Sequence, residues 1–367
     1  MLMMEDYLIS ASDQVLVTGS NGFIGARVVE CLLQYGISKI RCFVRPTRSL
    51  EQLEAIRRKF PAANIEFVRG DLLSLEDCKA AARDVSVIVH LAAGFEKSFL
   101  GAFMSSAMAT QNLLDAFLEY GRPRRFVHVS SFAVYSNINM ERGALLDERS
   151  PLEDAPQERH DTYGFGKLKQ EKVVMEYGQT RSLPYVIVRP GAVFGPGKTE
   201  LTGRAGVRLK KLFISVGGSN QLPLTYVDNC AEAIVLAALK KGVEGEIFNV
   251  VDDDLLTSRQ FLGVYRQRRP LFCVQIPYFA AYSFCAICER GSRYFKQLKR
   301  FNRRRCAADW KGNRFSNQKL CAQLGWKPRV SMNDAIERYL AQFASGQATQ
   351  SLHREVSTLG NVVSETT

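Results

Sequence analysis

The chain has 367 residues, of which 46% are hydrophobic and 23% charged, and this composition is typical of a globular protein with a large core. It excludes a disulfide-stabilised miniprotein, a collagen and a wholly disordered chain. The nine cysteines are an odd number without a framework pattern, which favours a reducing, cytoplasmic location. Cys285 and Cys288 form a C-x-x-C inside an apolar stretch, where we expect buried helix cysteines rather than a metal site.

The net charge of +12 is concentrated in one region, because residues 266–329 hold sixteen Lys and Arg against two acids. Partners that suit such a surplus are nucleic acid, an anionic membrane surface and an anionic small molecule. Nucleic acid is not expected, since no aromatic-interleaved binding module accompanies the charge. The basic residues adjoin the uncharged stretch 271–288, so segment 271–305 predicts either a peripheral membrane contact or a solvated basic helix beside a buried one. No apolar run is long enough to predict a transmembrane helix, and residues 1–13 do not resemble a secretory signal.

The first half of the chain alternates short apolar, β-branched runs with helical stretches. Six runs predict buried strands, at residues 14–18, 39–44, 64–68, 85–90, 125–129 and 185–188. Such short, apolar strands are typical of a parallel sheet covered by helices on both faces. The repeated β-α order therefore predicts an α/β fold with a doubly wound parallel sheet.

After residue 190 the pattern loosens. We expect, in order, a loop rich in glycine and lysine at 195–211, a helix near 229–240, a strand near 246–250 and helices to about residue 343. The predicted organisation is a first domain at 13–190, a smaller and mostly helical lobe at 191–343 with a possible return to the first domain around 225–240, and a disordered polar tail at 344–367.

Three glycines follow the first predicted strand, and a helix predicted at 26–34 begins directly after them. Gly19 permits a tight turn, Gly22 lets the backbone approach a pyrophosphate, and Gly25 lets the helix pack close to the sheet. The helix N-terminus adds unpaired N–H groups and the positive end of the helix dipole. Strand, turn and helix together predict a dinucleotide-binding site.

The end of the second strand bears on which dinucleotide binds. An acid is expected about 20 residues past the glycines, where it accepts hydrogen bonds from the adenosine ribose, but this chain has Arg45. A guanidinium can clamp a 2′-phosphate or lie on adenine, whereas a carboxylate would repel that phosphate. We therefore expect NAD or NADP, with NADP slightly favoured, and the alternative is that Arg45 is a solvated strand end.

A tyrosine and a lysine, Tyr163 and Lys167, lie one helical turn apart. A phenol is a poor base at neutral pH, but a neighbouring ammonium and an oxidised nicotinamide favour the phenolate. Tyr163 is therefore a candidate general acid/base for a substrate hydroxyl, and Lys167 would also hold the nicotinamide ribose. Ser131, at the end of the fifth predicted strand, would be the neutral hydrogen-bond partner of the substrate oxygen. The Y-x-x-x-K spacing alone is common on helices, so this prediction relies on the neighbouring motifs.

Seven motifs occur in the order seen in a known family. They are TGSNGFIG at 18–25, Gly70-Asp71-Leu72, His90-Leu91-Ala92-Ala93, Val129-Ser130-Ser131, Tyr163 with Lys167, Arg189-Pro190-Gly191 before Gly195-Pro196-Gly197, and Tyr226-Val227-Asp228-Asn229. With these motifs, residues 13–343 resemble the extended short-chain dehydrogenase/reductases, specifically the NAD-dependent epimerase/dehydratase family with 3β-hydroxysteroid dehydrogenase-like features. The resemblance implies a Rossmann-type NAD(P)-binding domain.

The resemblance also implies roles for individual residues. Ser131, Tyr163 and Lys167 would be catalytic. The cofactor would be bound by Gly19, Asn21, Gly22, Phe23, Ile24, Gly25, Arg45, Asp71, Leu72, Leu91, Ala92, Ala93, Ser130, Tyr163, Lys167, Pro190 and Val193. No metal is implied, and paired helices in the family often build a homodimer.

Two departures from the family pattern narrow the expected activity. The family's helper asparagine is replaced by Ser106 when its helix is aligned on Thr110. Sugar-nucleotide 4,6-dehydratases carry an acid–base pair directly after the serine or threonine. Loss of water requires one side chain to protonate the leaving hydroxyl and another to remove a proton from the neighbouring carbon. Those positions are Phe132 and Ala133 here, which argues against this dehydration.

Three functions are left open. The basic lobe would suit the diphosphate of a nucleotide sugar, which favours a nucleotide-sugar epimerase. Segments 222–229 and 248–254 look more like the hydroxysteroid dehydrogenase branch, which favours an apolar alcohol or ketone as substrate. A non-catalytic dinucleotide sensor or scaffold is the third, although the set of Ser131, Tyr163 and Lys167 argues against it.

Overall fold

The six predicted strands form most of one parallel sheet, and a seventh strand joins it at the edge. The computed structural model describes residues 7–209, 212–269 and 271–344. The strands are β1 (Gln14–Thr18), β2 (Lys39–Val44), β3 (Asn64–Arg69), β4 (Val85–His90), β5 (Arg125–Val129), β7 (Tyr185–Pro190) and β12 (Ile247–Val250). Their order across the sheet is β12-β7-β5-β4-β1-β2-β3, and all neighbouring strands are parallel. The predicted doubly wound α/β fold is thereby confirmed.

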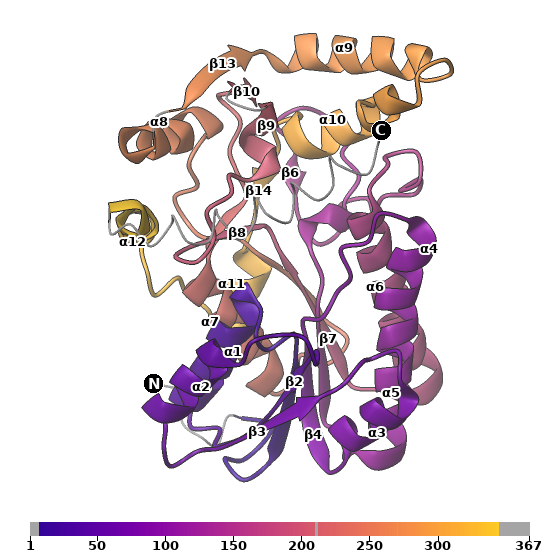
Figure 1. Cartoon of the computed structure of the whole chain (residues 1–367), viewed down its shortest axis with the longest axis vertical. Helices are drawn as coiled ribbons and strands as arrows, with labels where there is room; N and C mark the ends of the chain where they lie inside the picture. The colour runs from indigo at the N-terminus through magenta and orange to yellow at the C-terminus, as the bar shows by residue number, and fades with distance from the viewer. Residues whose placement is uncertain (1–6, 210–211, 270, 345–367) are drawn as a thin grey trace.

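Helices cover both faces of this sheet (Figure 1). One face carries α1 (Phe23–Gln34), α2 (Glu51–Lys59) and α7 (Val227–Leu239), and the other carries α3 (Leu75–Ala82), α5 (Ala109–Tyr120) and α6 (Thr162–Arg181). Successive strand residues alternate between the two layers, so Val15 and Val17 pack with α1 and α7 while Leu16 packs with α3 and α5. Both faces of the strands are therefore buried, as their uninterrupted apolar sequences predict.

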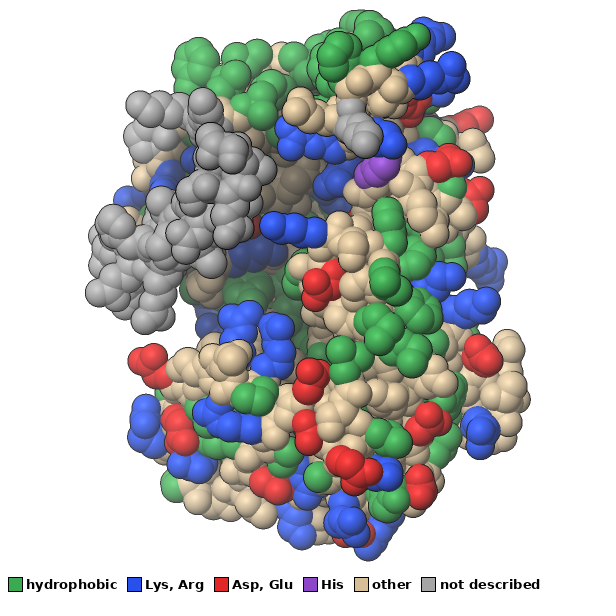
Figure 2. All heavy atoms as spheres, turned by 45° about the vertical axis from the view of Figure 1, so that its right-hand side comes forward, with side chains coloured by type: hydrophobic (Ala, Val, Ile, Leu, Met, Phe, Trp, Pro, Cys, Tyr) green, Lys and Arg blue, Asp and Glu red, His purple; other side chains and the backbone are tan. Residues whose placement is uncertain are grey.

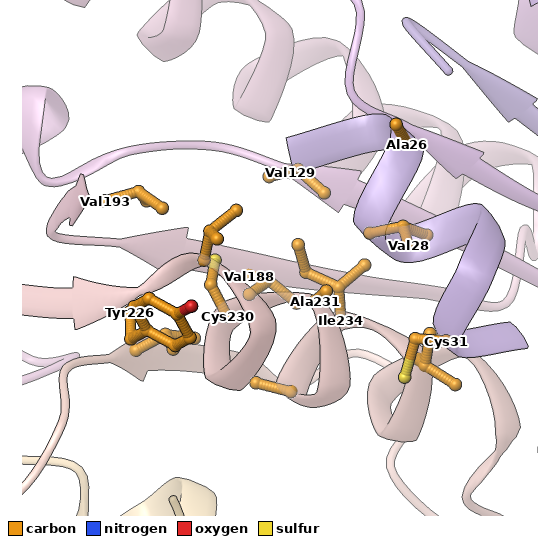
Figure 3. Packing of buried hydrophobic residues seen from close by; sticks show 14 of the residues in the cluster. Ala26, Val28, Cys31, Val129, Val188, Val193, Tyr226, Cys230, Ala231 and Ile234 are labelled. Carbon is orange, nitrogen blue, oxygen red and sulfur yellow. The ribbon is translucent and has the colours of Figure 1, made fainter. Parts of the chain in front are cut away.

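Helices α1 and α7 pack directly on each other, although they are far apart in the sequence. Ala26 and Val28 of α1 share one buried cluster with Ala231 and Ile234 of α7 (Figure 3). Helix α11 (Gln318–Leu324) adds side chains to the same cluster. The chain after residue 190 thus returns to the first sheet through α7 and again through β12 and α11, beyond the return predicted around 225–240.

The second lobe contains a three-stranded sheet as well as helices. Its strands, in the order β13-β10-β9, are β13 (Phe272–Ile276), β10 (Leu212–Val216) and β9 (Gly206–Leu209), and its helices are α8 (Ser258–Arg268), α9 (Tyr278–Gly291) and α10 (Arg303–Trp310). The prediction of a loop at 195–211 is wrong for β9, because β9 pairs antiparallel with β10. This lobe lies at the end of the molecule opposite α3 (Figure 1).

The fold also includes two pairs of short strands and two further helices. They are the paired strands β8 (Ala192–Phe194) with β11 (Leu224–Tyr226) and β6 (Leu145–Leu146) with β14 (Arg314–Phe315), and the helices α4 (Phe99–Ala102) and α12 (Met332–Ala344). No helix in the described part of the chain is long and apolar enough to cross a membrane. The predicted tail, from residue 345 on, lies outside the described residues.

Candidate active site

The glycine turn brings β1 and α1 into direct backbone contact. Gly19 has a φ of 67°, a conformation that favours glycine. A Cβ on Gly19 would lie 3.1 Å from the backbone nitrogen of Ala92, and a Cβ on Gly25 would lie 2.1 Å from the carbonyl oxygen of Gly19. The helix therefore packs against the turn as closely as the glycine spacing predicts.

The N-terminus of α1 is suited to bind an anion. The helix begins at Phe23 rather than at the predicted Ala26, and Gly22 is its N-cap residue. Among the described residues, no side chain caps this helix, and its first turn holds no acid. Its N–H groups and the positive end of its dipole are therefore left for a ligand, an arrangement that fits the diphosphate of a dinucleotide.

The loop 91–93, which follows β4, is held beside the glycine turn by a buried hydrogen-bond network. Ala92 N donates to Thr18 Oγ1 at 3.3 Å, and Thr18 Oγ1 lies 2.8 Å from His90 Nδ1. Gln170 on α6 donates to the carbonyl oxygen of Ala92 at 3.2 Å. Burial lowers the pKa of His90 to about 3, so the imidazole stays neutral and has a positioning role here.

The residue expected to select between NAD and NADP lies at the surface. Arg45 directly follows β2 and is exposed. Arg69, the last residue of β3, donates a hydrogen bond to the carbonyl oxygen of Pro46, so a second guanidinium lies beside the same loop. Asn21 of the glycine turn also reaches this loop, where its Nδ2 donates to Ser49 O at 3.3 Å.

Asp71 and Leu72 lie in the turn after β3. Asp71 is exposed, and its Oδ1 accepts a hydrogen bond from Leu73 N at 3.0 Å, so its carboxylate shapes its own turn. Leu72 is buried in the cluster below α3 and α5, and its carbonyl oxygen accepts from Asn112 Nδ2 at 3.1 Å. Most of the Leu72 side chain thus belongs to the core.

Tyr163, Lys167 and Ser131 come together at the carboxyl end of β5. Asp161 caps α6 by accepting a hydrogen bond from Gly164 N at 2.9 Å, which places Tyr163 in the first turn. The Ser131 side chain lies close enough to the Tyr163 phenol to lower its pKa. One turn later, Lys167 Nζ donates to the carbonyl oxygen of Val129 at 2.7 Å. The three predicted side chains therefore form one cluster.

The cluster is electrostatically tuned by burial. Burial and the nearby Asp161 carboxylate raise the pKa of Tyr163, whereas the neighbouring Ser131 side chain lowers it, and the net shift is upward. Burial lowers the pKa of Lys167 to about 7, although Glu171 opposes this shift. Because this pKa lies near neutral pH, a charged or hydrogen-bonding group that enters the site would change the protonation of Lys167.

The remaining predicted residues lie along the same edge of the sheet. Ser130 is buried, and its Oγ has no hydrogen-bond partner among the described residues. Pro190 ends β7 and is buried, and Val193 lies in β8 with 8% of its surface exposed. Because carboxyl ends of parallel strands meet at one edge, these residues and the glycine turn border one site.

Two residues near the cluster were not predicted. The ring of Phe95 stacks on the ring of Tyr163 with centroids 5.0 Å apart, and Phe95 is 83% exposed. Arg204 lies next to the residue that follows Ser131, because its guanidinium donates to the carbonyl oxygens of Ala308 at 2.9 Å and Phe132 at 3.5 Å. Neither has a sequence signal, since Phe95 lies in an irregular loop and Arg204 in the glycine-rich segment.

Ser106, which replaces the family's helper asparagine, is buried beside the cluster. It lies in a π-helical stretch, Phe103–Met108, that precedes α5. A Cβ on Gly166 would lie 2.9 Å from Ser106 Oγ, so the hydroxyl faces α6 one residue before Lys167. π-Helical stretches often occur at functional sites.

The described residues contain no group of three or more His, Cys, Asp or Glu that could hold a metal ion. Cys285 and Cys288 are both buried on α9, as expected for helix cysteines of the core.

The model of the NAD dependent epimerase/dehydratase family matches residues 15–250. The chain belongs to this family. The predicted resemblance to NAD(P)-dependent enzymes of the extended short-chain dehydrogenase/reductase type is therefore confirmed. The match begins at β1 and ends at β12, so it covers the whole seven-stranded sheet.

Curated relatives have different substrates. The chain is 28% identical, over 88% of its length, to a trifunctional UDP-glucose 4,6-dehydratase/UDP-4-keto-6-deoxy-D-glucose 3,5-epimerase/UDP-4-keto-L-rhamnose-reductase of Arabidopsis thaliana, and it spans only 46% of that enzyme. It is 23% identical, over 91% of its length and 92% of the relative's, to the decarboxylating sterol-4-alpha-carboxylate 3-dehydrogenase of Mus musculus.

Solved structures share the fold. The UDP-glucuronic acid 4-epimerase of Bacillus cereus, in complex with UDP-glucuronic acid and NAD, superposes with a TM-score of 0.67 at 22% identity, over 90% of this chain and 99% of that one. The UDP-glucose 4-epimerase of Thermus thermophilus, in complex with NAD, gives a TM-score of 0.64 at 22% identity over the same shares. Both structures hold NAD.

Proposed function

We propose that this protein interconverts a secondary alcohol and its ketone by hydride transfer to and from a nicotinamide cofactor, with Tyr163 as general acid/base. The observation that supports this function best is that the side chains of Ser131 and Tyr163 meet beside the buried Lys167. A non-catalytic dinucleotide sensor would not need a phenol, a hydroxyl and a low-pKa lysine in one cluster.

Each side chain has a separate task in this reaction. In the oxidation direction, the phenolate of Tyr163 takes the hydroxyl proton of the substrate while the carbinol C–H leaves as hydride and the C=O bond forms. Ser131 donates a hydrogen bond to the substrate oxygen. A bound nicotinamide supplies the hydride acceptor, and the cofactor would lie on the α1 N-terminus, loop 91–93 and Lys167. Reduction runs the same steps in reverse.

We infer a preference for NADP over NAD. The support is Arg45 at the end of β2, joined by Arg69 beside the same loop, since two guanidinium groups favour a 2′-phosphate. NAD, which the similar solved structures hold, is the alternative. Titration of the protein with NADPH and NADH, followed by nucleotide fluorescence, tests the preference directly.

A nucleotide sugar is the substrate that we propose first. No described carboxylate forms an ion pair with Arg204, and burial lowers the pKa of its guanidinium, so an anion beside it would be stabilised. Arg204 lies near Ser131, where a substrate diphosphate can extend from the reacting carbon. The nucleotide-sugar enzymes among the relatives and similar structures support the same class.

An apolar alcohol or ketone, such as a sterol, is the second candidate. The exposed Phe95 ring on Tyr163 supports it, because it offers the substrate an aromatic wall. The match along nearly the full length of the mouse sterol dehydrogenase supports it as well. An epimerisation of a nucleotide sugar and a net oxidation of a sterol differ in what happens to the cofactor.

The deciding experiment begins with the freshly purified protein. It is denatured, and the released nucleotide is identified by mass. An epimerase must retain its cofactor through a transient oxidation, so stoichiometric bound nucleotide and interconversion of UDP-sugars without net reduction would support the first candidate. An empty protein that reduces NADP⁺ with a sterol but not with a UDP-sugar would support the second. Binding of neither nucleotide would contradict both.

A further inference from the structure

An apolar surface lies at the end of the molecule opposite α3 (Figure 1). Helix α9 buries Ala281, Cys285 and Cys288, which are spaced four and three residues apart and so share one face. The rest of the helix also carries large apolar side chains, because Phe279, Phe284 and Ile287 are all exposed. Large apolar side chains that the fold leaves uncovered form a surface for a partner.

This surface continues before and after α9. We define the apical surface as Phe272 of β13, Phe279, Phe284 and Ile287 of α9, and Tyr294 and Phe295 of the turn that follows, with side chains between 54% and 84% exposed. Figure 2 shows hydrophobic side chains gathered over this end of the molecule, with Lys and Arg side chains beside them. Tyr294 N and Phe295 N both donate to Gly291 O, so the two rings sit on an ordered turn.

Positive charge borders the apical surface. Segment 271–305 holds eight Lys and Arg against one acid, Glu289, and that acid is paired with Arg303. Four of the cations, Arg290, Arg293, Lys299 and Arg300, form no ion pair with any described residue; we call these four the basic rim. The rim is therefore available to an anionic partner.

The apolar apical surface and the basic rim together favour one kind of partner. A second copy of this chain would bring one basic rim against another across a two-fold axis, which like-charge repulsion disfavours. An anionic bilayer satisfies both features, because its acyl region takes aromatic and aliphatic side chains while its headgroups take Lys and Arg. Exposed aromatic side chains flanked by basic ones are the composition of interfacial membrane contacts.

We propose that the apical surface and the basic rim dock this protein on the surface of an anionic lipid bilayer, with α9 lying in the interface plane. The described helices do not cross a membrane, so this contact is peripheral. Helix α10, which packs on α9 through Cys306, also carries Ala308, the carbonyl partner of Arg204. The docked lobe is therefore connected to the substrate side of the site, and the contact does not depend on which substrate is used.

The test is sedimentation of the full chain with lipid vesicles, one set of phosphatidylcholine alone and one containing about one third phosphatidylglycerol. We expect binding to the anionic vesicles that weakens at high salt, and little binding to the neutral ones. Phe279→Ser with Ile287→Ser should lower the partition coefficient by at least about tenfold, because two apolar side chains no longer insert. Arg290→Glu with Arg293→Glu should also lower binding, and its loss should be largest at low salt.

Matched controls lie at the other end of the molecule. Leu73→Ser with Leu75→Ser changes two exposed apolar residues, and Lys39→Glu with Arg58→Glu makes the same charge change. Both should bind vesicles like the wild type. All variants should keep the wild-type melting temperature, since every changed side chain is exposed.

Insertion has its own readout. Ile287→Trp should show fluorescence that shifts to the blue on anionic vesicles and is quenched by brominated acyl chains. The proposal is overturned if the anionic vesicles bind no protein, if the controls lose as much binding as the apical variants, or if brominated chains do not quench. It is equally overturned if light scattering shows a dimer that Phe279→Ser with Ile287→Ser dissociates, because the surface would then serve a second copy or another protein.

Discussion

Lys167 on α6 donates a 2.7 Å hydrogen bond from its Nζ to the carbonyl oxygen of Val129, the last residue of β5. The helix that carries Tyr163 is thereby fixed to the strand that leads to Ser131. The two catalytic candidates meet because one buried lysine joins their elements. A group that competes for the Lys167 ammonium, such as a ribose hydroxyl of a bound dinucleotide, would act at the same point.

Replacement of the phenol tests the acid/base role. Tyr163→Phe should lower turnover by about 10²–10⁴-fold, because the proton loses its acceptor, while nucleotide affinity stays within a few-fold of the wild type. Turnover is measured with whichever of the two proposed substrates, a UDP-sugar or a sterol, the protein accepts, and affinity by nucleotide fluorescence. Tyr177→Phe, which removes a phenol farther along the same helix, is the control and should keep wild-type turnover. Equal turnover of Tyr163→Phe and the control would remove Tyr163 from the reaction.

Cofactor selection is expected to depend on Arg45. Arg45→Glu should weaken NADPH binding by about 10–100-fold and leave NADH binding nearly unchanged, since a carboxylate repels the 2′-phosphate. The ratio of the two dissociation constants is the quantity to compare. Arg58→Glu on α2 makes the same charge change at another exposed position and should leave the ratio as it is. A ratio that Arg45→Glu also leaves unchanged would show that Arg45 is a solvated strand end.

Two helical glycines with different surroundings should respond oppositely to alanine. Gly25→Ala would place a Cβ 2.1 Å from the Gly19 carbonyl oxygen, so it should abolish nucleotide binding or lower the melting temperature strongly. Gly263→Ala in α8 meets no atom within 4 Å and should stabilise the protein by roughly 0.5–1 kcal/mol. Thermal denaturation and nucleotide titration of both variants check this contrast. A Gly25→Ala protein that binds nucleotide normally would contradict the predicted approach.

Lys167 should make stability depend on pH. Its folded pKa of about 7 lies below the ordinary value of 10.5, so between these values the unfolded chain holds a proton that the folded chain lacks. Stability therefore rises with pH across this window, and below about pH 7 the buried ammonium costs the folded state its full penalty.

Lys167→Met removes that penalty. Its free energy of unfolding should exceed that of the wild type near pH 6, by on the order of 2 kcal/mol after the lost hydrogen bond to Val129 is allowed for, and the difference should disappear or reverse near pH 10. Urea denaturation at several pH values measures it. A difference that is constant with pH would mean that the lysine titrates normally in the folded protein.

Phe95 distinguishes the two substrate classes. If the substrate is apolar, Phe95→Ala should raise its KM several-fold without changing nucleotide affinity, because the ring on Tyr163 is lost as a contact. A nucleotide sugar, held through its diphosphate, should be affected less. Leu100→Ala, which changes another strongly exposed apolar residue, serves as the control in steady-state kinetics.

Much of the first sheet could be predicted because its strands are buried on both faces. The strands predicted at 14–18, 39–44, 85–90 and 125–129 agree with β1, β2, β4 and β5, and the strand at 185–188 continues to Pro190. The small sheet of the second lobe could not be predicted, since β13 is an exposed edge strand and β9 begins at a glycine. β13 pairs with β10, from which it is distant in the sequence.

The site was predictable only where motifs define it. Tyr163, Lys167 and Ser131 are marked by spacing and by strand ends, and the structure brings them together. The position of Phe95 depends on the path of an irregular loop and that of Arg204 on a single 3-10 turn, and no local pattern specifies either. The sequence left open whether segment 271–288 is buried or exposed, because its apolar composition suits both a buried helix and a membrane contact.

The most direct test of the central claim is a titration of the Tyr163 phenol. The ultraviolet absorbance of phenolate is recorded against pH for the wild type and for Tyr163→Phe, with and without saturating NADP⁺, and the two are subtracted. Without nucleotide, burial should hold the Tyr163 pKa above its ordinary value. With NADP⁺, the nicotinamide charge and Lys167 should lower that pKa by at least about one unit. A Tyr163 pKa that saturating nucleotide leaves unchanged would contradict its role as the general acid/base.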